Sequence, residues 1–185
     1  MAIESNNSLA LGAKAPEFTL VDVVSGKAMT LDTCTGSRGL LVMFICKHCP
    51  YVVHVQDEIA RLGRDYLKQN LGIVAISSND IVAYPDDAPM HLKAMAEKLG
   101  FEFPFCFDEA QSVAKAYGAA CTPEFFLFDS ARTLVYHGQL DSSRPKSGKA
   151  ADGADLRHAI DALIAGKPVS RDQKPSVGCS IKWRG

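Results

Sequence analysis

Two patterns of apolar residues run along this chain, and each predicts a different kind of element. Short runs of consecutive apolar residues are typical of strands that are covered on both faces of a sheet. Apolar residues spaced three and four apart indicate helices with one buried face. The runs predict strands at Leu40–Ile45, Ile73–Ile76, Phe105–Phe107, Phe125–Phe128 and Leu134–His137, and the spaced pattern predicts helices at residues 52–66, 92–99, 113–117 and 156–164.

The order of these elements predicts an α/β fold. Strands that alternate with helices are usually parallel, whereas two strands joined by a tight turn are antiparallel. The last two strands are joined in this second way, and an earlier hairpin is expected at residues 18–31 around Gly26. We therefore expect a mixed central β-sheet flanked by helices, with an N-terminal β-hairpin extension. Residues 1–185 would form a single domain with a loose lead-in at 1–11 and a tail at 168–185.

Composition and charge exclude several classes of function. The chain has 185 residues, of which 47% are hydrophobic and 22% charged, and its net charge is −1. No basic excess is present to neutralise a phosphate backbone, so we expect no nucleic-acid partner. The longest apolar run, Leu40–Cys46, is too short to span a bilayer, so we expect no membrane partner. The N-terminus lacks the features of a signal peptide, which favours a cytoplasmic location.

The cysteines supply the candidate chemistry. Of six cysteines, Cys46 and Cys49 form the one close pair, and they lie where a buried strand gives way to the longest helix. A helix start favours an anion, and Lys47 and His48 add positive charge, so we expect a lowered pKa for the Cys46 thiol. Cys49 is expected in the first helical turn. The hypothesis is that Cys46 attacks a substrate disulfide and Cys49 resolves the mixed disulfide.

A metal site is the alternative interpretation of this pair. A CxxC pair can be half of a zinc site, and a metal-binding carrier would use Cys46, His48 and Cys49. No second CxxC follows in the sequence, although His54, Cys121 and Cys179 could complete such a site in space. His48 could instead be a solvated loop residue. The strand-to-helix context favours redox chemistry, and we expect no metal and no other cofactor.

Four segments resemble a known family, the thioredoxin-like proteins of the redoxin superfamily, which also contains alkyl hydroperoxide reductase and thiol-specific antioxidant proteins. The resemblance runs from about residue 12 to the C-terminus. The ordered set of segments is much more specific than a CxxC pair alone. The segments are Gly12–Leu20, Cys46–Val52 with the sequence CKHCPYV, Cys121–Asp129, and Gly178–Trp183.

The resemblance implies a thioredoxin fold and a redox activity. It makes Thr122-Pro123 the cis-proline that faces the CxxC pair, with a backbone that lines the groove for protein or low-molecular-weight thiol and disulfide substrates. Peroxiredoxins have threonine where this chain has Cys46, and they carry an arginine near the position of Pro123. Both departures favour a thiol–disulfide oxidoreductase. A thiol-dependent peroxidase, an antioxidant of the peroxiredoxin type, is the alternative.

Glu124, Cys121 and Cys179 each allow two interpretations. The family's buried aspartate is missing from the strand before the pair, where Met43 stands, so Glu124 is a candidate base or else an exposed acid. Cys121, close to Pro123, is an additional redox thiol or a small buried hydrophobe. Cys179 is a resolving thiol or part of a segment that packs Trp183 onto the domain, and we favour packing.

Overall fold

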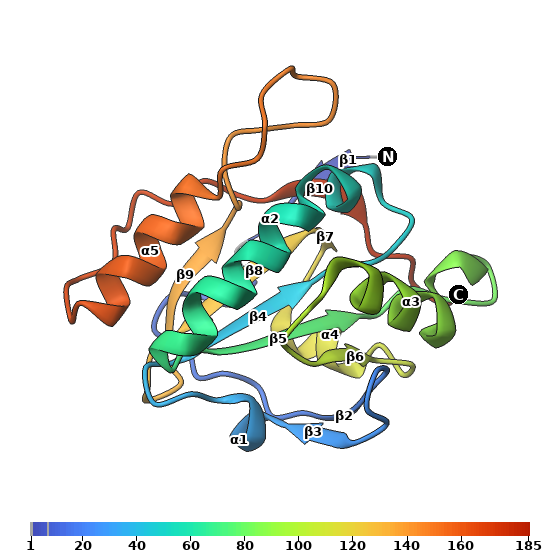
Figure 1. Cartoon of the computed structure of the whole chain (residues 1–185), viewed down its shortest axis with the longest axis horizontal. Helices are drawn as coiled ribbons and strands as arrows, with labels where there is room; N and C mark the ends of the chain where they lie inside the picture. The colour runs from blue at the N-terminus through green and yellow to red at the C-terminus, as the bar shows by residue number, and fades with distance from the viewer. Residues whose placement is uncertain (1, 7) are drawn as a thin grey trace.

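The computed structural model describes residues 2–6 and 8–185, and a mixed sheet of seven strands forms its centre (Figure 1). The strands lie in the order β3-β2-β6-β5-β4-β8-β9. Their bounds are β2 Thr19–Asp22, β3 Ala28–Thr30, β4 Leu40–Phe44, β5 Gly72–Ser77, β6 Phe105–Phe107, β8 Glu124–Phe128 and β9 Leu134–Gly138.

The three strands in the middle of the sheet, β6, β5 and β4, are parallel. The two hairpins, β2–β3 and β8–β9, add antiparallel strands at its edges. β4 pairs with β5 in parallel and with β8 in antiparallel register, so that Met43 lies between Ala75 and Phe125. β2 joins the edge of β6 in antiparallel register and brings β3 with it. The mixed sheet expected from the alternation of elements is confirmed, and the N-terminal hairpin does extend it.

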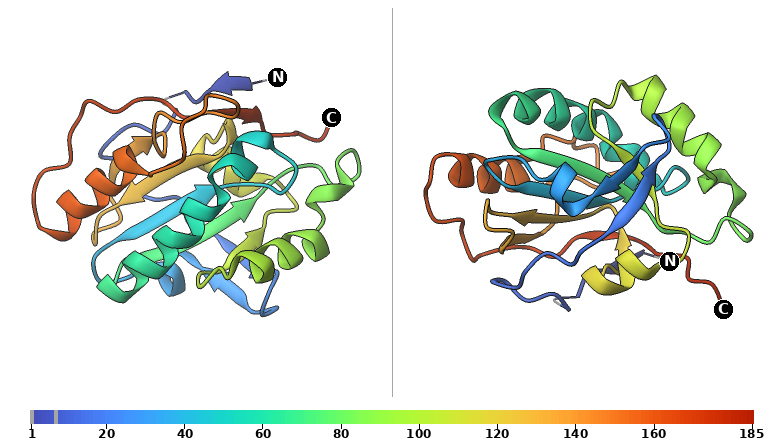
Figure 2. Two further views of the ribbon diagram at one scale, coloured as in Figure 1. Left: turned by 45° about the horizontal axis from the view of Figure 1, so that its top comes forward. Right: turned by 90° about the horizontal axis from the view of Figure 1, so that it is seen from below.

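Helices cover both faces of this sheet, as Figure 2 shows. One core lies between the sheet and three helices, and it contains Leu41 and Ile73 from the strands. A second core, with Phe44 and Phe126, lies under two shorter helices. The first face carries α2 Pro50–Tyr66, α3 Pro89–Leu99 and α5 Ala154–Ile164; the second carries α1 Leu31–Cys34 and α4 Ser112–Tyr117; and single 3-10 turns lie at η1 Leu67–Gln69 and η2 Pro85–Asp87.

Among the described residues, no helix combines the length and the apolar character needed to cross a bilayer.

The two ends of the chain meet in a second sheet of three strands, β1-β10-β7, beside the start of α2 (Figure 1). β10 (Val177–Ser180) lies in the middle, between β1 (Ala2–Glu4) and β7 (Cys121–Thr122). The expectation of a loose lead-in and tail is therefore wrong for these strands, because each end supplies the backbone partners that the other needs. Met1 and Asn7, which belong to the expected lead-in, lie outside the described residues.

Candidate active site

The CKHC segment connects the end of β4 to the start of α2. The helix begins at Pro50, which suits the first helical position because its missing N–H would have no partner there. Cys49 is the residue that caps the helix, one position before the turn in which we expected it. Cys46 precedes the cap by three residues. Both side chains are fully buried, with 0% exposure.

The wall facing the pair is the Thr122-Pro123 segment, whose peptide bond is cis. The hydroxyl of Thr122 lies 3.3 Å from the sulfur of Cys46, and the sulfur of Cys49 lies 3.2 Å from the carbonyl oxygen of Thr122. Residues more than 70 positions apart in the chain thus lie against each other at the end of the sheet. The structure brings the predicted site residues Cys46, Cys49, Thr122 and Pro123 together.

The groups around the two sulfurs shift their pKa values in opposite directions. The hydrogen-bond interaction with the Cys46 side chain is the largest cause that lowers the pKa of Cys49. The backbone N–H groups of Val52 and Cys179 and the Cys179 thiol add to this lowering, and these donors outweigh burial and the nearby Thr122 carbonyl. The same bond to Cys49, together with burial, raises the pKa of Cys46. The surroundings of Cys49 thus favour a thiolate more than those of Cys46 do, although the Cys49 sulfur also lies in donating geometry to the Thr122 carbonyl oxygen.

Asp87, in η2, explains why the positive charge beside Cys46 has no acidifying effect. Its buried carboxylate accepts hydrogen bonds from the backbone N–H groups of Lys47 (2.8 Å) and His48 (3.1 Å). It also lies 2.5 Å from Nδ1 of His48 and accepts a bond from Asn79. The negative charge of Asp87 contributes to the raised pKa of Cys46. His48 is therefore not a freely solvated loop residue. Sequence reasoning missed Asp87, because no local pattern links it to a motif 38 residues earlier.

A third sulfur lies against the pair. Cys179 is in register with Thr122 across β10 and β7, and its thiol donates to Cys49. Burial and this contact with Cys49 raise the pKa of Cys179 to about 11. Trp183 is 42% exposed, and the Nζ of Lys115 lies 5.8 Å from the centre of its ring, so the tail packs Trp183 against the domain only in part. The favoured interpretation did not include the contact of Cys179 with the redox pair.

Glu124 is fully buried and contacts neither sulfur of the pair. Its carboxylate accepts from the backbone N–H groups of Ala120 (2.8 Å) and Cys121 (3.0 Å) and lies 2.7 Å from Nε2 of His137. Glu124 is thus neither an exposed acid nor a base for Cys49 in this geometry. It holds the backbone just before the cis-proline.

Cys121 is a buried thiol beside this carboxylate. Burial and the charge of Glu124 raise the pKa of Cys121 strongly, which is the behaviour of a small buried hydrophobe. Cys34 and Cys106 are buried too, and burial raises the pKa of each. Cys34 is the last residue of α1.

The donor atoms that could hold a metal ion do not form the expected set. Cys46, His48 and Asp87 each place one donor atom within 4.8 Å of the other two, whereas Cys49 is not part of this group. A carrier that uses Cys46, His48 and Cys49 together is therefore not supported by the arrangement. The Asp87 carboxylate is already occupied by four hydrogen-bonding groups.

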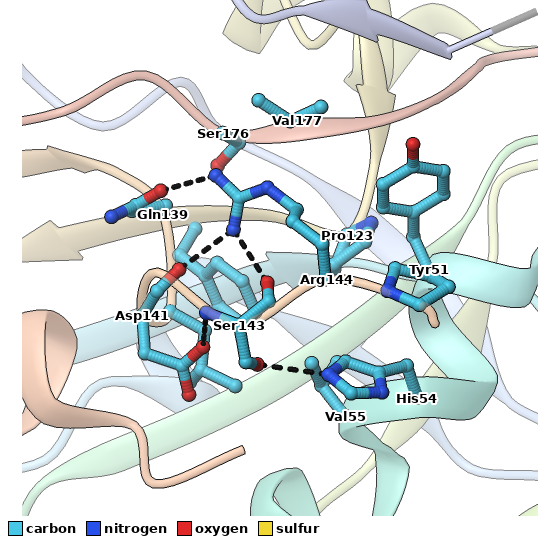
Figure 3. Close-up of a pocket in the computed structure, with 13 residues that line it drawn as sticks. Tyr51, His54, Val55, Pro123, Gln139, Asp141, Ser143, Arg144, Ser176 and Val177 are labelled. Atoms are coloured by element: carbon cyan, nitrogen blue, oxygen red, sulfur yellow. Dashed lines mark hydrogen bonds between the residues drawn. The ribbon is translucent and has the colours of Figure 1, made fainter. Parts of the chain in front are cut away.

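A cleft opens beside the cis-proline, between the first turn of α2 and the loop after β9 (Figure 3). Tyr51, Pro123 and Arg144 line this cleft. The guanidinium of Arg144 donates to the carbonyl oxygens of Asp141 (2.8 Å) and Ser143 (2.6 Å), so it stiffens its own loop. The cleft offers an apolar wall and a charged rim next to the site.

A model of the Redoxin family matches residues 10–154 of the chain. None of the curated proteins compared with the chain matches it.

Solved structures resemble the chain at two levels of sequence identity, as two similar chains and one distant chain show. An uncharacterized conserved protein from Geobacillus kaustophilus is 49% identical, with a TM-score of 0.96, and the match covers 100% of this chain and 97% of that one. A hypothetical protein from Sinorhizobium meliloti 1021 is 48% identical, with a TM-score of 0.95 and 98% of each chain covered. The thioredoxin domain of a thiol-disulfide oxidoreductase from Bacteroides vulgatus is 19% identical, with a TM-score of 0.58, covering 70% of this chain and 89% of that one. At that identity the likeness shows the fold alone, which is thioredoxin-like.

Proposed function

Because the chain belongs to the redoxin family, we propose that it is a thiol–disulfide oxidoreductase whose redox pair is Cys46 and Cys49. One observation carries the proposal: two buried cysteine sulfurs lie together at the N-terminus of α2, against the Thr122-Pro123 segment. The thiolate is the reactive form of cysteine, and a second thiol beside it completes a dithiol that can close to a disulfide.

The proposed reaction begins with Cys49 as the attacking thiolate, in place of Cys46, because the groups around Cys49 lower its pKa whereas those around Cys46 raise it. Cys49 attacks one sulfur of a substrate disulfide, and the other substrate sulfur leaves as a thiolate. Cys46 then attacks the Cys49 sulfur of the mixed disulfide and releases the second substrate thiolate. The substrate gains two electrons, and the chain is left with a Cys46–Cys49 disulfide. The Cys46 proton passes to a departing thiolate.

We assign supporting roles to the residues around the pair. Lys47 and His48 donate backbone N–H groups to Asp87 and so fix the segment between the two cysteines. Thr122 and Pro123 form the wall that a protein or low-molecular-weight disulfide would meet, and Glu124 holds this wall in place. A reducing compartment such as the cytoplasm would keep the pair in its dithiol form.

Reduction of insulin with dithiothreitol as the electron donor tests the proposal. Wild type should accelerate the reaction, and Cys49→Ser should abolish the acceleration because the attacking sulfur is gone. Cys34→Ala is the matched control, since Cys34 belongs to the core on the opposite face and should leave the rate unchanged. A wild type that consumes hydrogen peroxide with a thiol donor while leaving insulin untouched would contradict the proposal.

A thiol-dependent peroxidase is the second candidate, and the position of Cys49 favours it. A single thiolate at a helix cap is also suited to attack peroxide. Against it, neither sulfur of the pair is hydrogen-bonded to an arginine within residues 2–6 and 8–185. Peroxide turnover that exceeds insulin reduction, and that survives in Cys46→Ala, would favour this candidate.

A further inference from the structure

The redox centre contains three sulfurs rather than two, and Cys49 is the one that both of the others contact. The Cys46 side chain interacts with Cys49 from the end of β4, and the Cys179 side chain interacts with it from β10. Figure 1 shows β10 beside the start of α2, where Cys49 caps the helix. Cys49 can therefore form a disulfide with either neighbour.

The pairing register of β10 and β7 places Cys179, and not Cys121, next to Cys49. Successive side chains of a strand point to opposite faces, so Cys121 and Thr122 face opposite ways. Cys179 is paired with Thr122, whose hydroxyl contacts Cys46, whereas Cys121 is paired with Ser180. The Cys121 sulfur lies instead 4.0 Å from the carbonyl oxygen of Pro123.

Gly178 lets β10 come close enough for this contact. A Cβ atom at Gly178 would lie 2.0 Å from the carbonyl oxygen of Thr122 and 3.1 Å from the nitrogen of Pro123. No side chain fits between β10 and the cis-proline loop at this point. The glycine before Cys179 thus sets the distance between Cys179 and the redox pair.

We propose that Cys179 is a third redox thiol, which takes over the disulfide from Cys46 after each catalytic cycle. The proposal rests on the proposed function for the formation of the Cys46–Cys49 disulfide. The Cys179 sulfur attacks the Cys49 sulfur, the Cys46–Cys49 bond breaks, and the electron pair goes to Cys46. The proton of Cys179 ends on Cys46. One disulfide is exchanged for another, so no further oxidant or reductant is needed.

Oxidation of the Cys46–Cys49 pair removes the interactions with Cys49 that raise the pKa of Cys179. In the reduced state, the hydrogen bond to Cys49 and the charge on Cys49 both raise the pKa of Cys179. Neither persists once Cys49 is in a disulfide, whereas Lys182 still favours the Cys179 thiolate. Cys179 therefore becomes a better nucleophile just when there is a disulfide to attack.

The exchange moves the disulfide from a buried place to a more accessible one. Cys46 and Cys49 have 0% exposure, while Cys179 is only partly buried and lies on a strand held by short ladders. An external thiol reaches a disulfide only where a sulfur is accessible. The Cys49–Cys179 disulfide is thus the form that an external reductant meets.

Disulfide mapping of the full-length protein tests the proposal. Wild type is equilibrated in dithiothreitol redox buffers, quenched in acid, alkylated, digested and analysed without reduction by mass spectrometry. We expect both Cys46–Cys49 and Cys49–Cys179 disulfides. In Cys46→Ala, Cys49–Cys179 should become the main intramolecular disulfide. Cys179 that stays alkylated at every potential in both proteins would overturn the proposal.

Two double variants test whether Cys179 or Cys121 is the disulfide partner of Cys49. Cys46→Ala with Cys179→Ala should form no intramolecular disulfide at Cys49, and Cys46→Ala with Cys121→Ala should retain Cys49–Cys179. A Cys49–Cys121 disulfide in Cys46→Ala would overturn the assignment. In Cys179→Ala, reduction of the oxidised pair by dithiothreitol should slow by about tenfold or more, because the buried disulfide must be reached directly. An unchanged rate would contradict the transfer step.

Insulin reduction by wild type distinguishes a failure of the proposed function from a failure of the proposal that Cys179 is a third redox thiol. No insulin turnover together with a Cys49–Cys179 disulfide would refute the proposed function and leave the third thiol in place. Turnover with Cys179 always free would refute the third thiol and leave the proposed function in place.

Discussion

Single residues set the charge on the redox pair through the groups that face each sulfur. Cys49 lies near the backbone N–H groups of Val52 and Cys179 and near the Thr122 carbonyl oxygen. Cys46 lies near the Thr122 hydroxyl and the buried carboxylate of Asp87. The helix N-terminus lies next to Cys49, and its effect falls off within the first turn, so it favours a Cys49 thiolate more than a Cys46 thiolate.

Replacing Cys46 by alanine should raise the pKa of Cys49. The Cys46 thiol is the largest cause of the low pKa, and hydrogen bonds to charged groups are worth about 1.5–3 kcal/mol. At 1.36 kcal/mol for each pH unit, the titration of Cys49 should move upward by about 1 to 2 pH units. The thiolate absorbance near 240 nm, followed against pH, measures this. Cys34→Ala should titrate as wild type does, and an unchanged midpoint in Cys46→Ala would mean that the charge does not lie on Cys49.

Replacing Asp87 by asparagine should lower the pKa of Cys46. The amide retains an oxygen for the N–H groups of Lys47 and His48 but removes the negative charge that opposes a Cys46 thiolate. The upper titration step of the reduced pair should move to lower pH, and the protein should lose about 1–3 kcal/mol of stability as the buried network is disturbed. Thiolate absorbance and urea unfolding measure the two effects. An upward movement of that step would contradict the assigned role of Asp87.

Whether a residue of the site could be predicted depends on how far along the sequence it lies from the residues that it contacts. Cys46 and Cys49 stand in one short motif, and the Thr122-Pro123 segment has a recognisable resemblance, so these positions follow from the sequence. Asp87 and the placement of Cys179 depend on contacts between residues 39 to 130 positions apart. No local pattern reports such contacts, so sequence reasoning did not include the effects of Asp87 and Cys179 on the pKa values of the pair.

At the scale of elements, the long and strongly patterned segments were predicted well. β4 and α2 follow from a continuous apolar run and from a helical repeat. The strands β1, β7 and β10 were missed because each has two to four residues and none contains a run of large apolar side chains such as Phe105–Phe107. They form only because each strand finds backbone partners on another segment.

The short ladder between β10 and β7 should be sensitive to Gly178→Ala. The added methyl group would collide with the Thr122 carbonyl, so β10 must move away from the cis-proline loop. We expect less Cys49–Cys179 disulfide than in wild type and a smaller lowering of the Cys49 pKa, because both donors of Cys179 move with the strand. Disulfide mapping and thiolate titration measure these changes.

Gly185→Ala is the matched control for that variant. It adds the same methyl group in the same tail, but no atom lies within 4 Å of the new Cβ. The control should behave as wild type. An unchanged disulfide pattern in Gly178→Ala would show that close approach of β10 is not what places Cys179.

At the scale of the whole molecule, both ends of the chain close over the catalytic end of the sheet. β1 holds one side of β10, and β7 holds the other. Beyond β10, the backbone of Lys182 exchanges hydrogen bonds with Asn79 and Asp80, in the segment that leads to Asp87. The cover over the pair is therefore built from distant segments whose strand ladders are short, with three residue pairs between β1 and β10 and two between β10 and β7.

This architecture predicts that the cover opens without unfolding the main sheet. Units with few backbone hydrogen bonds and few buried contacts open at lower free energy than the core. In the reduced protein, amide hydrogens of β1 and β10 should exchange with deuterium much faster than those of β4, β5 and β8, which lie inside the seven-stranded sheet. In the oxidised protein, a Cys49–Cys179 disulfide would tie β10 to the start of α2, so exchange in β10 should slow. Hydrogen-exchange mass spectrometry of both states measures this, with β4 and β5 as the internal control. If β10 is as protected as β4 in the reduced state, the cover does not open separately, and a buried Cys49 would have no route to a substrate disulfide.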